Sequence, residues 1–250
     1  MFRYSLLLMF ICLSSTIFAQ LYCPPPHGKR SDGSFHISLG AGPTYLRGDI
    51  HKPNTVGRAA FFRLDYTILK GIDLGIEGQF GSLEALGDVT DPREVRNNYR
   101  GIGLVATFYP FKFFSAPRYT RPSLVELIGE SFYVGVGIMG LVNNYDSIYR
   151  DMAMPSTWGP TAYVDPDDGP IFQTRTNSMT LPTANVGLAV PINKRRSTMG
   201  KYWSVLLNAQ FNFANNDLVD GYTPYDAAGN PIDTAHDMYS FYTLGVRYSF

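Results

Sequence analysis

The clearest pattern in this chain is the alternation of apolar and polar positions in its last segment, residues 237–250. Every second residue from Tyr242 to Phe250 is apolar or aromatic, whereas the positions between them hold small, polar or charged residues such as Arg247. Successive side chains of a β-strand point to opposite faces, so this segment has one apolar and one polar face. That pattern is typical of a strand that crosses a membrane.

Seven further segments repeat this alternation. The two clearest are joined by Lys70 and Gly71, and they predict a β-hairpin with a short turn. Pro182 interrupts the sixth segment near its start, so that strand is the weakest of the set. In chain order, the predicted strands cover residues 35–45, 58–69, 72–80, 99–111, 131–143, 177–190, 201–214 and 237–250.

The connections between these segments alternate in length. Those after the first, third, fifth and seventh strands are long and rich in Asp, Asn, Pro and Gly, and we expect them to face the outside of the cell; they cover residues 46–57, 82–98, 144–176 and 215–236. The others are short, except for residues 113–130, within which residues 123–128 favour a short helix. An even number of strands places both ends of the barrel in the periplasm.

We therefore predict an all-β fold, an eight-stranded antiparallel transmembrane up-and-down β-barrel. Only a closed barrel can span a membrane with strands, because every backbone polar group must be paired within lipid. A soluble lipocalin-like barrel is one alternative, but it would put its apolar residues inside. A β-sandwich is another, but its strands are usually shorter than these segments.

The first residues predict export. Arg3 gives a short basic start, an apolar segment follows, and small residues lead to Ala19. This order is typical of a secretory signal peptide over residues 1–19, with cleavage after Ala19. An uncleaved anchor helix is the alternative, but Ser14 and Ser15 interrupt the apolar run. We expect residues 20–34 to form a periplasmic lead-in and residues 35–250 to form the barrel, with Cys23 as the one cysteine of the mature chain.

Charge does not favour a nucleic-acid partner. The chain has 21 basic and 21 acidic residues, and its densest basic spot, residues 194–196, is better explained as a solvated turn.

The inner faces of the strands predict polar side chains inside the barrel. Eight strands enclose a space that side chains just fill, and buried charges must be paired and hydrogen-bonded. We expect an interlocked polar network that packs the lumen; a path for protons or ions is the functional alternative. The predicted lumen network comprises Arg63, Asp65, Asp73, Glu77, Gln79, Asn208, Gln210 and Arg247.

Signals for a cofactor, a metal or catalysis are weak. Residues 135–140 match a dinucleotide-binding glycine pattern by letter, but they lie on a predicted strand with no helix after it. The four histidines are scattered, and the acidic residues at 165–168 fit a solvated turn better than a calcium site. Lipid A deacylases of this size would need a Ser–His pair, and His36 has no obvious serine partner. We expect no catalytic, cofactor-binding or metal-binding residues.

Aromatic residues in the predicted outer loops could form an interaction surface, since Tyr and Trp often anchor interfaces. Trp158 and Tyr163 lie farthest from the strands, so they are the candidates for contact with a ligand. The alternative is a belt of aromatic residues at the lipid headgroups.

Two stretches resemble a known group of proteins. Residues 216–224, followed by 237–239 and the strand to Phe250, resemble the closing hairpin of small outer-membrane barrels from Bacteroidetes-type bacteria, and residues 133–137 recur in that group. The aromatic end at Tyr248 and Phe250 is similar to the C-terminal assembly signal of bacterial outer-membrane barrels. The resemblance implies an outer-membrane location, contact with lipid and the barrel-assembly machinery, and a supporting role in a complex such as type IX secretion. It implies no catalytic residue.

Three hypotheses follow for the function. The first is a non-enzymatic structural or accessory component of an envelope or secretion complex. The second is a surface receptor or adhesin that acts through the loops at 144–176 and 215–236. The third is a porin-like channel for small solutes.

Overall fold

The computed structural model describes residues 34–48, 50, 55–87, 91–115, 123–165, 169–192, 201–223 and 236–250. The predicted signal peptide and all of the predicted lead-in except Ser34 lie outside these residues.

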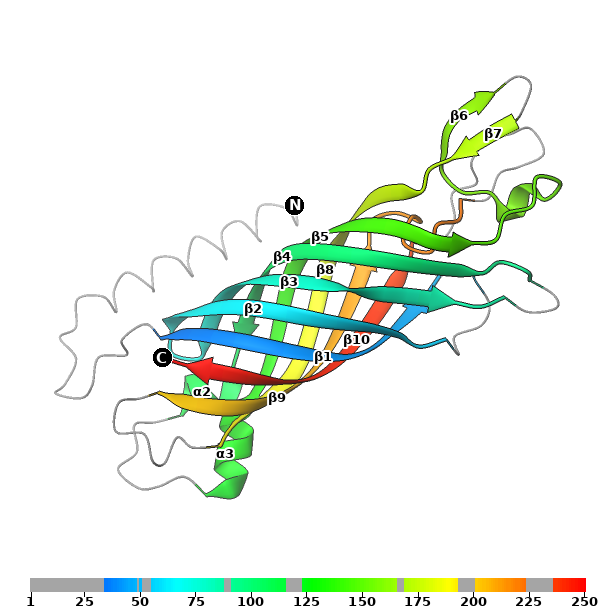
Figure 1. The fold of residues 1–250 in the computed structure, drawn as a ribbon. Coiled ribbons are helices and arrows are strands. Elements are labelled where there is room, and N and C mark those ends of the chain that lie inside the picture. The colour runs from blue at the N-terminus through cyan, green and yellow to red at the C-terminus, as the bar shows by residue number, and fades with distance from the viewer. Residues whose placement is uncertain are drawn as a thin grey trace, which may run out of the picture. The chain divides into compact units, whose positions relative to one another are not determined.

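Eight long antiparallel strands close into a barrel (Figure 1). Around the ring the order is β1-β10-β9-β8-β5-β4-β3-β2. Apart from β1 and β10, each pair of strands that is adjacent in the ring is therefore also consecutive among these eight strands along the chain. Each predicted segment overlaps one strand of the barrel. The strands are β1 (Phe35–Arg47), β2 (Gly57–Leu69), β3 (Ile72–Ala85), β4 (Val95–Phe108), β5 (Phe132–Ile148), β8 (Arg175–Pro191), β9 (Tyr202–Ala214) and β10 (Met238–Ser249).

The first and last strands complete the ring. In β1 and β10, His36 pairs with Ser249 and Arg47 pairs with Met238. The backbone N–H of Phe250 also donates to the carbonyl oxygen of Phe35 at 2.9 Å. We call this end of the barrel the terminal end, and we call the opposite end, which carries the longer connections, the loop end.

The outer wall of the barrel is apolar. Ile102 is 68% exposed and Leu244 is 62% exposed, and alternate residues on the other strands behave alike. This is the reverse of a lipocalin-like soluble barrel, whose apolar side chains point inward. Further exposed apolar residues of the outer wall are Leu39, Phe62, Leu64, Leu74, Ile76, Leu104, Val136, Ile138, Leu207 and Val246.

Several strand boundaries differ from those that alternation predicts, most clearly in β4 and β5. The predicted strand over residues 99–111 is wrong at both ends, because β4 starts at Val95 and stops at Phe108. Pro110 then opens a short helix, α2 (Pro110–Phe114). Proline favours the first turn of a helix, where its missing N–H costs no hydrogen bond. At the other end of the barrel, β5 continues to Ile148, beyond the predicted end at residue 143.

Pro182 produces a bulge in β8 rather than a break. Thr180 and Thr183 are both buried although they are three residues apart, and the pairing with β5 and with β9 shifts register between them. An extra residue in one strand changes the phase of its alternation, and proline is tolerated at such a point because it cannot donate to the ladder.

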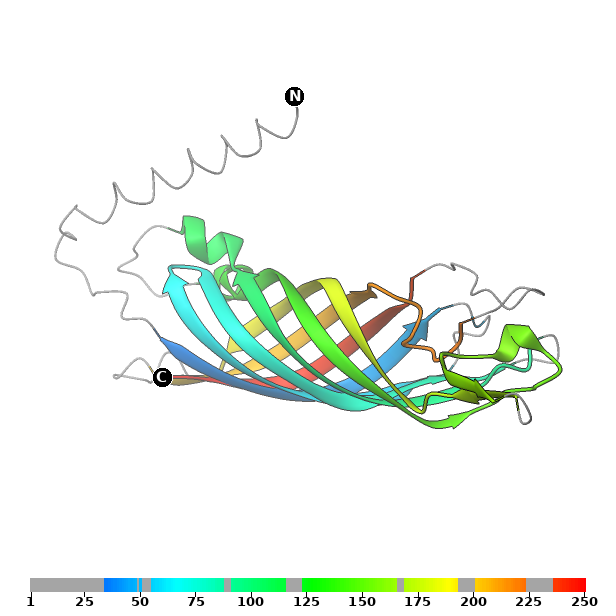
Figure 2. The same ribbon diagram turned by 90° about the horizontal axis from the view of Figure 1, so that it is seen from above.

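Smaller elements lie at both ends of the barrel (Figures 1 and 2). At the terminal end, α2 is followed by α3 (Leu124–Ser131), in the region where a short helix was expected. Ser123 and Glu126 form a capping box at its start. At the loop end, η1 (Pro155–Thr157) and the paired strands β6 (Thr161–Asp165) and β7 (Gly169–Phe172) interrupt the long connection after β5. None of the helices in the described part of the chain has the length and apolar character needed to cross a membrane.

Candidate functional site

A chain of polar side chains crosses the middle of the lumen. Nε of Arg63 donates to Oε2 of Glu77 at 2.7 Å, and the amide of Gln79 donates to Oε1 of Glu77 at 2.6 Å. The same amide lies 2.8 Å from the side-chain oxygen of Gln210. Gln79 belongs to β3 and Gln210 to β9, which are four strands apart in the ring of eight and therefore face each other. The side chains thus close the lumen from one wall to the other.

Aromatic rings share this central space. The rings of Tyr99 on β4 and Tyr239 on β10 have centroids 5.4 Å apart, and both hydroxyls donate to Oε1 of Gln79 at 3.3 Å. These two strands also lie on opposite sides of the ring. Phe61 and Phe241 form a second ring pair at 6.2 Å. The lumen is therefore packed by aromatic as well as polar side chains, and only the polar part was predicted from the sequence.

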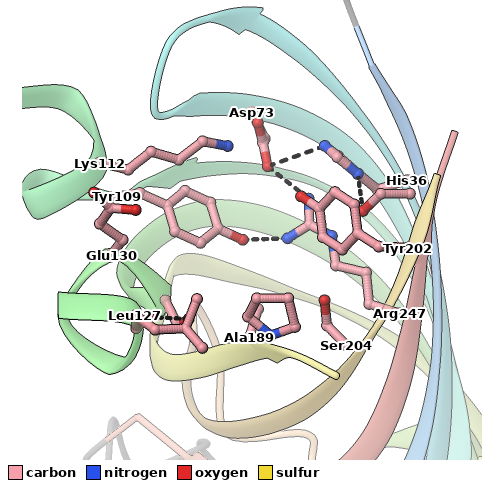
Figure 3. Close-up of a pocket in the computed structure, with 13 residues that line it drawn as sticks. His36, Asp73, Tyr109, Lys112, Leu127, Glu130, Ala189, Tyr202, Ser204 and Arg247 are labelled. Atoms are coloured by element: carbon pink, nitrogen blue, oxygen red, sulfur yellow. Dashed lines mark hydrogen bonds and ion pairs between the residues drawn. The ribbon is translucent and has the colours of Figure 1, made fainter. Parts of the chain in front are cut away.

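A second polar cluster lies at the terminal end (Figure 3). One guanidinium nitrogen of Arg247 donates to Asp73 at 2.6 Å, and another donates to the hydroxyl of Tyr109. The carboxylate of Asp65 lies 3.9 Å from the same guanidinium. A buried cation with carboxylates and a hydroxyl around it is the arrangement that makes burial of the charge tolerable.

His36 connects this cluster to the end of β10. Its Nδ1 lies 2.8 Å from the hydroxyl of Ser249, and its Nε2 lies 3.0 Å from the hydroxyl of Thr67. Because Thr67 donates to Asp73 at 2.7 Å, its oxygen is left to accept from Nε2–H, and Nδ1 can accept from Ser249. The expectation that His36 has no serine partner is wrong. The two residues are 213 positions apart, and only closure of the barrel brings them together.

A small cavity of about 40 Å³ lies beside these groups (Figure 3). Its walls include His36, Asp73 and Arg247 from the barrel and Leu127 and Glu130 from α3. A volume of this size has room for a few water molecules. The α2–α3 segment therefore lies beside the lumen at the terminal end.

The structure places seven of the eight predicted lumen residues in two neighbouring clusters. All eight residues are buried. Four belong to the central chain described above, and Asp65, Asp73 and Arg247 belong to the terminal cluster. Asn208 stands apart from both and accepts a hydrogen bond from the hydroxyl of Tyr133 at 2.9 Å.

Tyr248 and Phe250, the predicted assembly signal, lie on the outer wall. Their ring centroids are 4.8 Å apart, and Tyr248 is also 4.8 Å from the ring of Trp203. These rings form an aromatic edge at the terminal end, where a membrane interface favours Trp and Tyr.

The connection between β9 and β10 folds into the barrel at the loop end. Backbone N–H groups of Val219 and Asp220 donate to Oδ2 of Asp237 at 2.8 and 3.0 Å, and the hydroxyl of Tyr222 donates to the carbonyl of Tyr149 at 2.8 Å. Burial raises the pKa of the Tyr222 phenol, which keeps it a hydrogen-bond donor. Val219, Asp220 and Tyr222 are buried, so this part of the connection packs into the barrel mouth at the loop end; residues 224–235 lie outside the described part.

The long connection after β5 is held by aromatic contacts. The indole N–H of Trp158 donates to the carbonyl of Asp151 at 3.1 Å, and its ring lies 6.2 Å from that of Phe172. The guanidinium of Arg150 sits 4.4 Å from the centre of the Phe172 ring. Tyr163 lies in β6, but its side chain is outside the described part of the structure. Trp158 thus has a packing role in this loop.

Acidic side chains gather at the loop end, where ligand atoms of Asp217, Asp220 and Asp237 lie within 4.8 Å of one another. Oδ2 of Asp237 already accepts two backbone N–H groups, so this cluster serves to hold the loop in the barrel mouth.

Of the acidic turn considered in the sequence, residues 166–168 fall outside the described residues. Gly135 and Gly137 lie within β5, and the next described helix in the chain is η1, well beyond them.

Comparisons with known proteins give matches only among solved structures. No protein-family model matches the chain, and no curated protein matches it in sequence. Ail, the attachment invasion locus protein of Yersinia pestis, is 12% identical with a TM-score of 0.39, covering 87% of this chain and 99% of that one. Neisserial surface protein A is 9% identical with a TM-score of 0.43, covering 88% and 100%. A major outer membrane protein from Thermus thermophilus is 13% identical with a TM-score of 0.38, covering 87% and 99%. Similarities at this level transfer no function.

Proposed function

We propose that this protein is a non-enzymatic outer-membrane β-barrel with a closed lumen that serves as a structural or accessory component of an envelope complex. The apolar outer wall supports a position in lipid, because a water-soluble barrel would not expose alternate apolar residues on all its strands. The hydrogen bond between Gln79 and Gln210 across the lumen is the observation that carries the proposal.

The closed lumen argues against a porin-like channel. A conducting pore needs a continuous path filled with water. Here Tyr99 and Tyr239 meet from opposite walls of the lumen. The chain of polar side chains from Arg63 to Gln210 fills the lumen at the same level. The α2–α3 segment lies beside the lumen at one end, and the buried residues Val219, Asp220 and Tyr222 occupy the other. Transport through the centre would require several of these contacts to break together.

The terminal cluster argues for packing rather than catalysis. Ser249 and His36 have the contact that a nucleophile and its base require. However, the cavity beside them has room for a few waters only, which is too small for an acyl ester. Asp73, which would orient the histidine, is engaged by Arg247 at 2.6 Å.

With the lumen closed, a partner would have to bind outside it, and the loop end offers one such surface. Apolar side chains are exposed there at Tyr149, Met152, Met154 and Ile171. The closing hairpin resembles small Bacteroidetes-type outer-membrane barrels, and some members of that group assist type IX secretion. This gives the specific form of the proposal, a supporting role in that machinery. Deletion of the gene should then alter the profile of secreted proteins.

A surface receptor or adhesin is the second candidate, and the ordered loop after β5 favours it. The β6–β7 pair and the contacts of Trp158 and Arg150 with Phe172 hold this loop in a defined shape, as a binding surface requires. The two candidates differ in their partner, which is a protein of the same envelope in the first and an external ligand in the second.

Photo-crosslinking in native membranes tests the proposal and separates the candidates. A photoreactive amino acid would replace Met152 or Ile171 at the loop end, with Ile102 on the apolar wall as the matched control. We expect a discrete protein adduct from the loop positions and lipid adducts alone from position 102. Loop adducts that form only after an external ligand is added would favour the receptor. If neither loop position gives a protein adduct, with or without the external ligand, both candidate functions are contradicted.

A further inference from the structure

The α2–α3 segment exposes a cluster of large apolar side chains at the terminal end. Val125 is 81% exposed, Phe114 is 78% exposed and Leu124 is 69% exposed. Phe111 and Ile128 are exposed as well. We call these five residues the apolar foot. Isolated exposed apolar residues are ordinary, but a contiguous set on one short segment marks a contact surface.

The apolar foot continues the outer wall of the barrel. Phe113 packs on Phe108 with ring centroids 5.5 Å apart, and Phe111 packs on Phe132 at 6.2 Å. Phe108 and Phe132 have the same outward parity on β4 and β5 as the exposed residues of the apolar wall. The rings of α2 therefore extend that wall past the ends of the two strands, and Phe114 follows at 5.1 Å from Phe113.

The other side of α3 is already used. Leu127 and Glu130 face the small cavity at the end of the lumen, together with Lys112 (Figure 3). Gly129 lies against the ring of Phe111, where a Cβ would meet the ring at 4.0 Å. The helix thus has one side on the barrel and another, with Leu124, Val125 and Ile128, that nothing in the described structure covers.

We propose that the apolar foot inserts into the boundary between headgroups and acyl chains of the periplasmic leaflet, so that the turn between β4 and β5 is a membrane anchor. The proposal rests on the proposed outer-membrane position of the barrel. Lipid is the occupant because the foot is continuous with the apolar wall through Phe108 and Phe132, and because amphipathic helices with Phe, Leu and Val on one face bind at this depth. Without this contact with lipid, Phe114 and Val125 would be exposed to water.

The test is depth-dependent fluorescence quenching in vesicles of phosphatidylethanolamine and phosphatidylglycerol. Single cysteines labelled with an environment-sensitive dye would replace Phe114 or Val125 in the full mature chain, in a C23S background. Leu124→Cys is a reserve position in case one variant does not fold. Ile102→Cys on the wall and Met152→Cys at the loop end are the lipid and water controls.

We expect lipids with a nitroxide near the headgroup to quench positions 114 and 125 several-fold more strongly than position 152, and iodide in water to do the reverse. If lipid quenches position 102 while iodide quenches positions 114 and 125, the barrel lies in the membrane but the foot does not, and the anchor proposal is wrong. Protection of 114 and 125 from both quenchers would mean that protein covers the foot, which also overturns the proposal. If lipid fails to quench position 102 as well, the proposed outer-membrane position fails with it.

Discussion

The amide of Gln79 on β3 donates to the side-chain oxygen of Gln210 on β9 at 2.8 Å, directly across the lumen. This contact depends on the ion pair next to it, because the same amide also donates to Glu77, which accepts from Arg63. The packing of the lumen is therefore a connected network, in which loss of one member leaves the others without partners.

Replacement of Arg63 with alanine should strongly destabilise the barrel. Glu77 would be left as a buried, unpaired carboxylate, and breaking such a pair costs about 3–5 kcal/mol. The free energy of unfolding can be measured by urea titration of the protein folded into lipid vesicles. Arg96→Ala is the matched control, since its 3.4 Å pair with Glu84 lies on the surface and should contribute about 0–1 kcal/mol. Equal losses for the two variants would contradict a connected network.

Ser249→Ala tests the function of the contact with His36. A packing role predicts a loss of about 1 kcal/mol of stability, the typical net value of one hydrogen bond. It also predicts that the native protein does not react with a fluorophosphonate probe, because the hydroxyl is buried beside a cavity with room for water only. Covalent labelling of Ser249 that disappears in His36→Ala would identify a nucleophile and overturn the non-enzymatic interpretation.

Asp237→Asn should loosen the connection between β9 and β10. The carboxylate accepts the N–H groups of Val219 and Asp220, and hydrogen bonds to a charged acceptor contribute about 1.5–3 kcal/mol. We expect faster proteolysis and faster hydrogen exchange within residues 215–223 while the barrel stays folded. Asp146→Asn, at an exposed position on β5, should change neither rate. Unchanged protection in the Asp237 variant would show that other contacts hold this loop.

The outer wall is the part of the fold that the sequence predicts best. Alternate residues such as Leu74 and Ile76 are apolar and point out of the barrel, so a period of two is visible without any knowledge of the neighbouring strands. The alternation stops after Phe108, because Pro110 opens a helix that contains Phe111. At that point a local backbone preference decides the structure.

The inside of the barrel is harder to predict, because its contacts join residues distant in the chain. Tyr239 and Phe241 have the same inward parity as Arg247, and parity alone could have placed them in the lumen. No feature of the sequence near His36 or Ser249 indicated that the two side chains would pair. The burial of Val219, Asp220 and Tyr222 was also hidden, because they stand in a long connection between strands and their partners Asp237 and Tyr149 are distant in the chain.

Solute flux through the reconstituted protein tests the closed lumen most directly. Vesicles carrying the folded chain would be floated on a density gradient to show insertion, and then assayed for osmotic swelling in a small sugar and for conductance in planar bilayers. A general porin in the same lipids would be the positive control. We predict swelling no faster than that of empty vesicles and no stepwise current. Rapid swelling or regular current steps from inserted protein would contradict the closed lumen and restore the channel hypothesis.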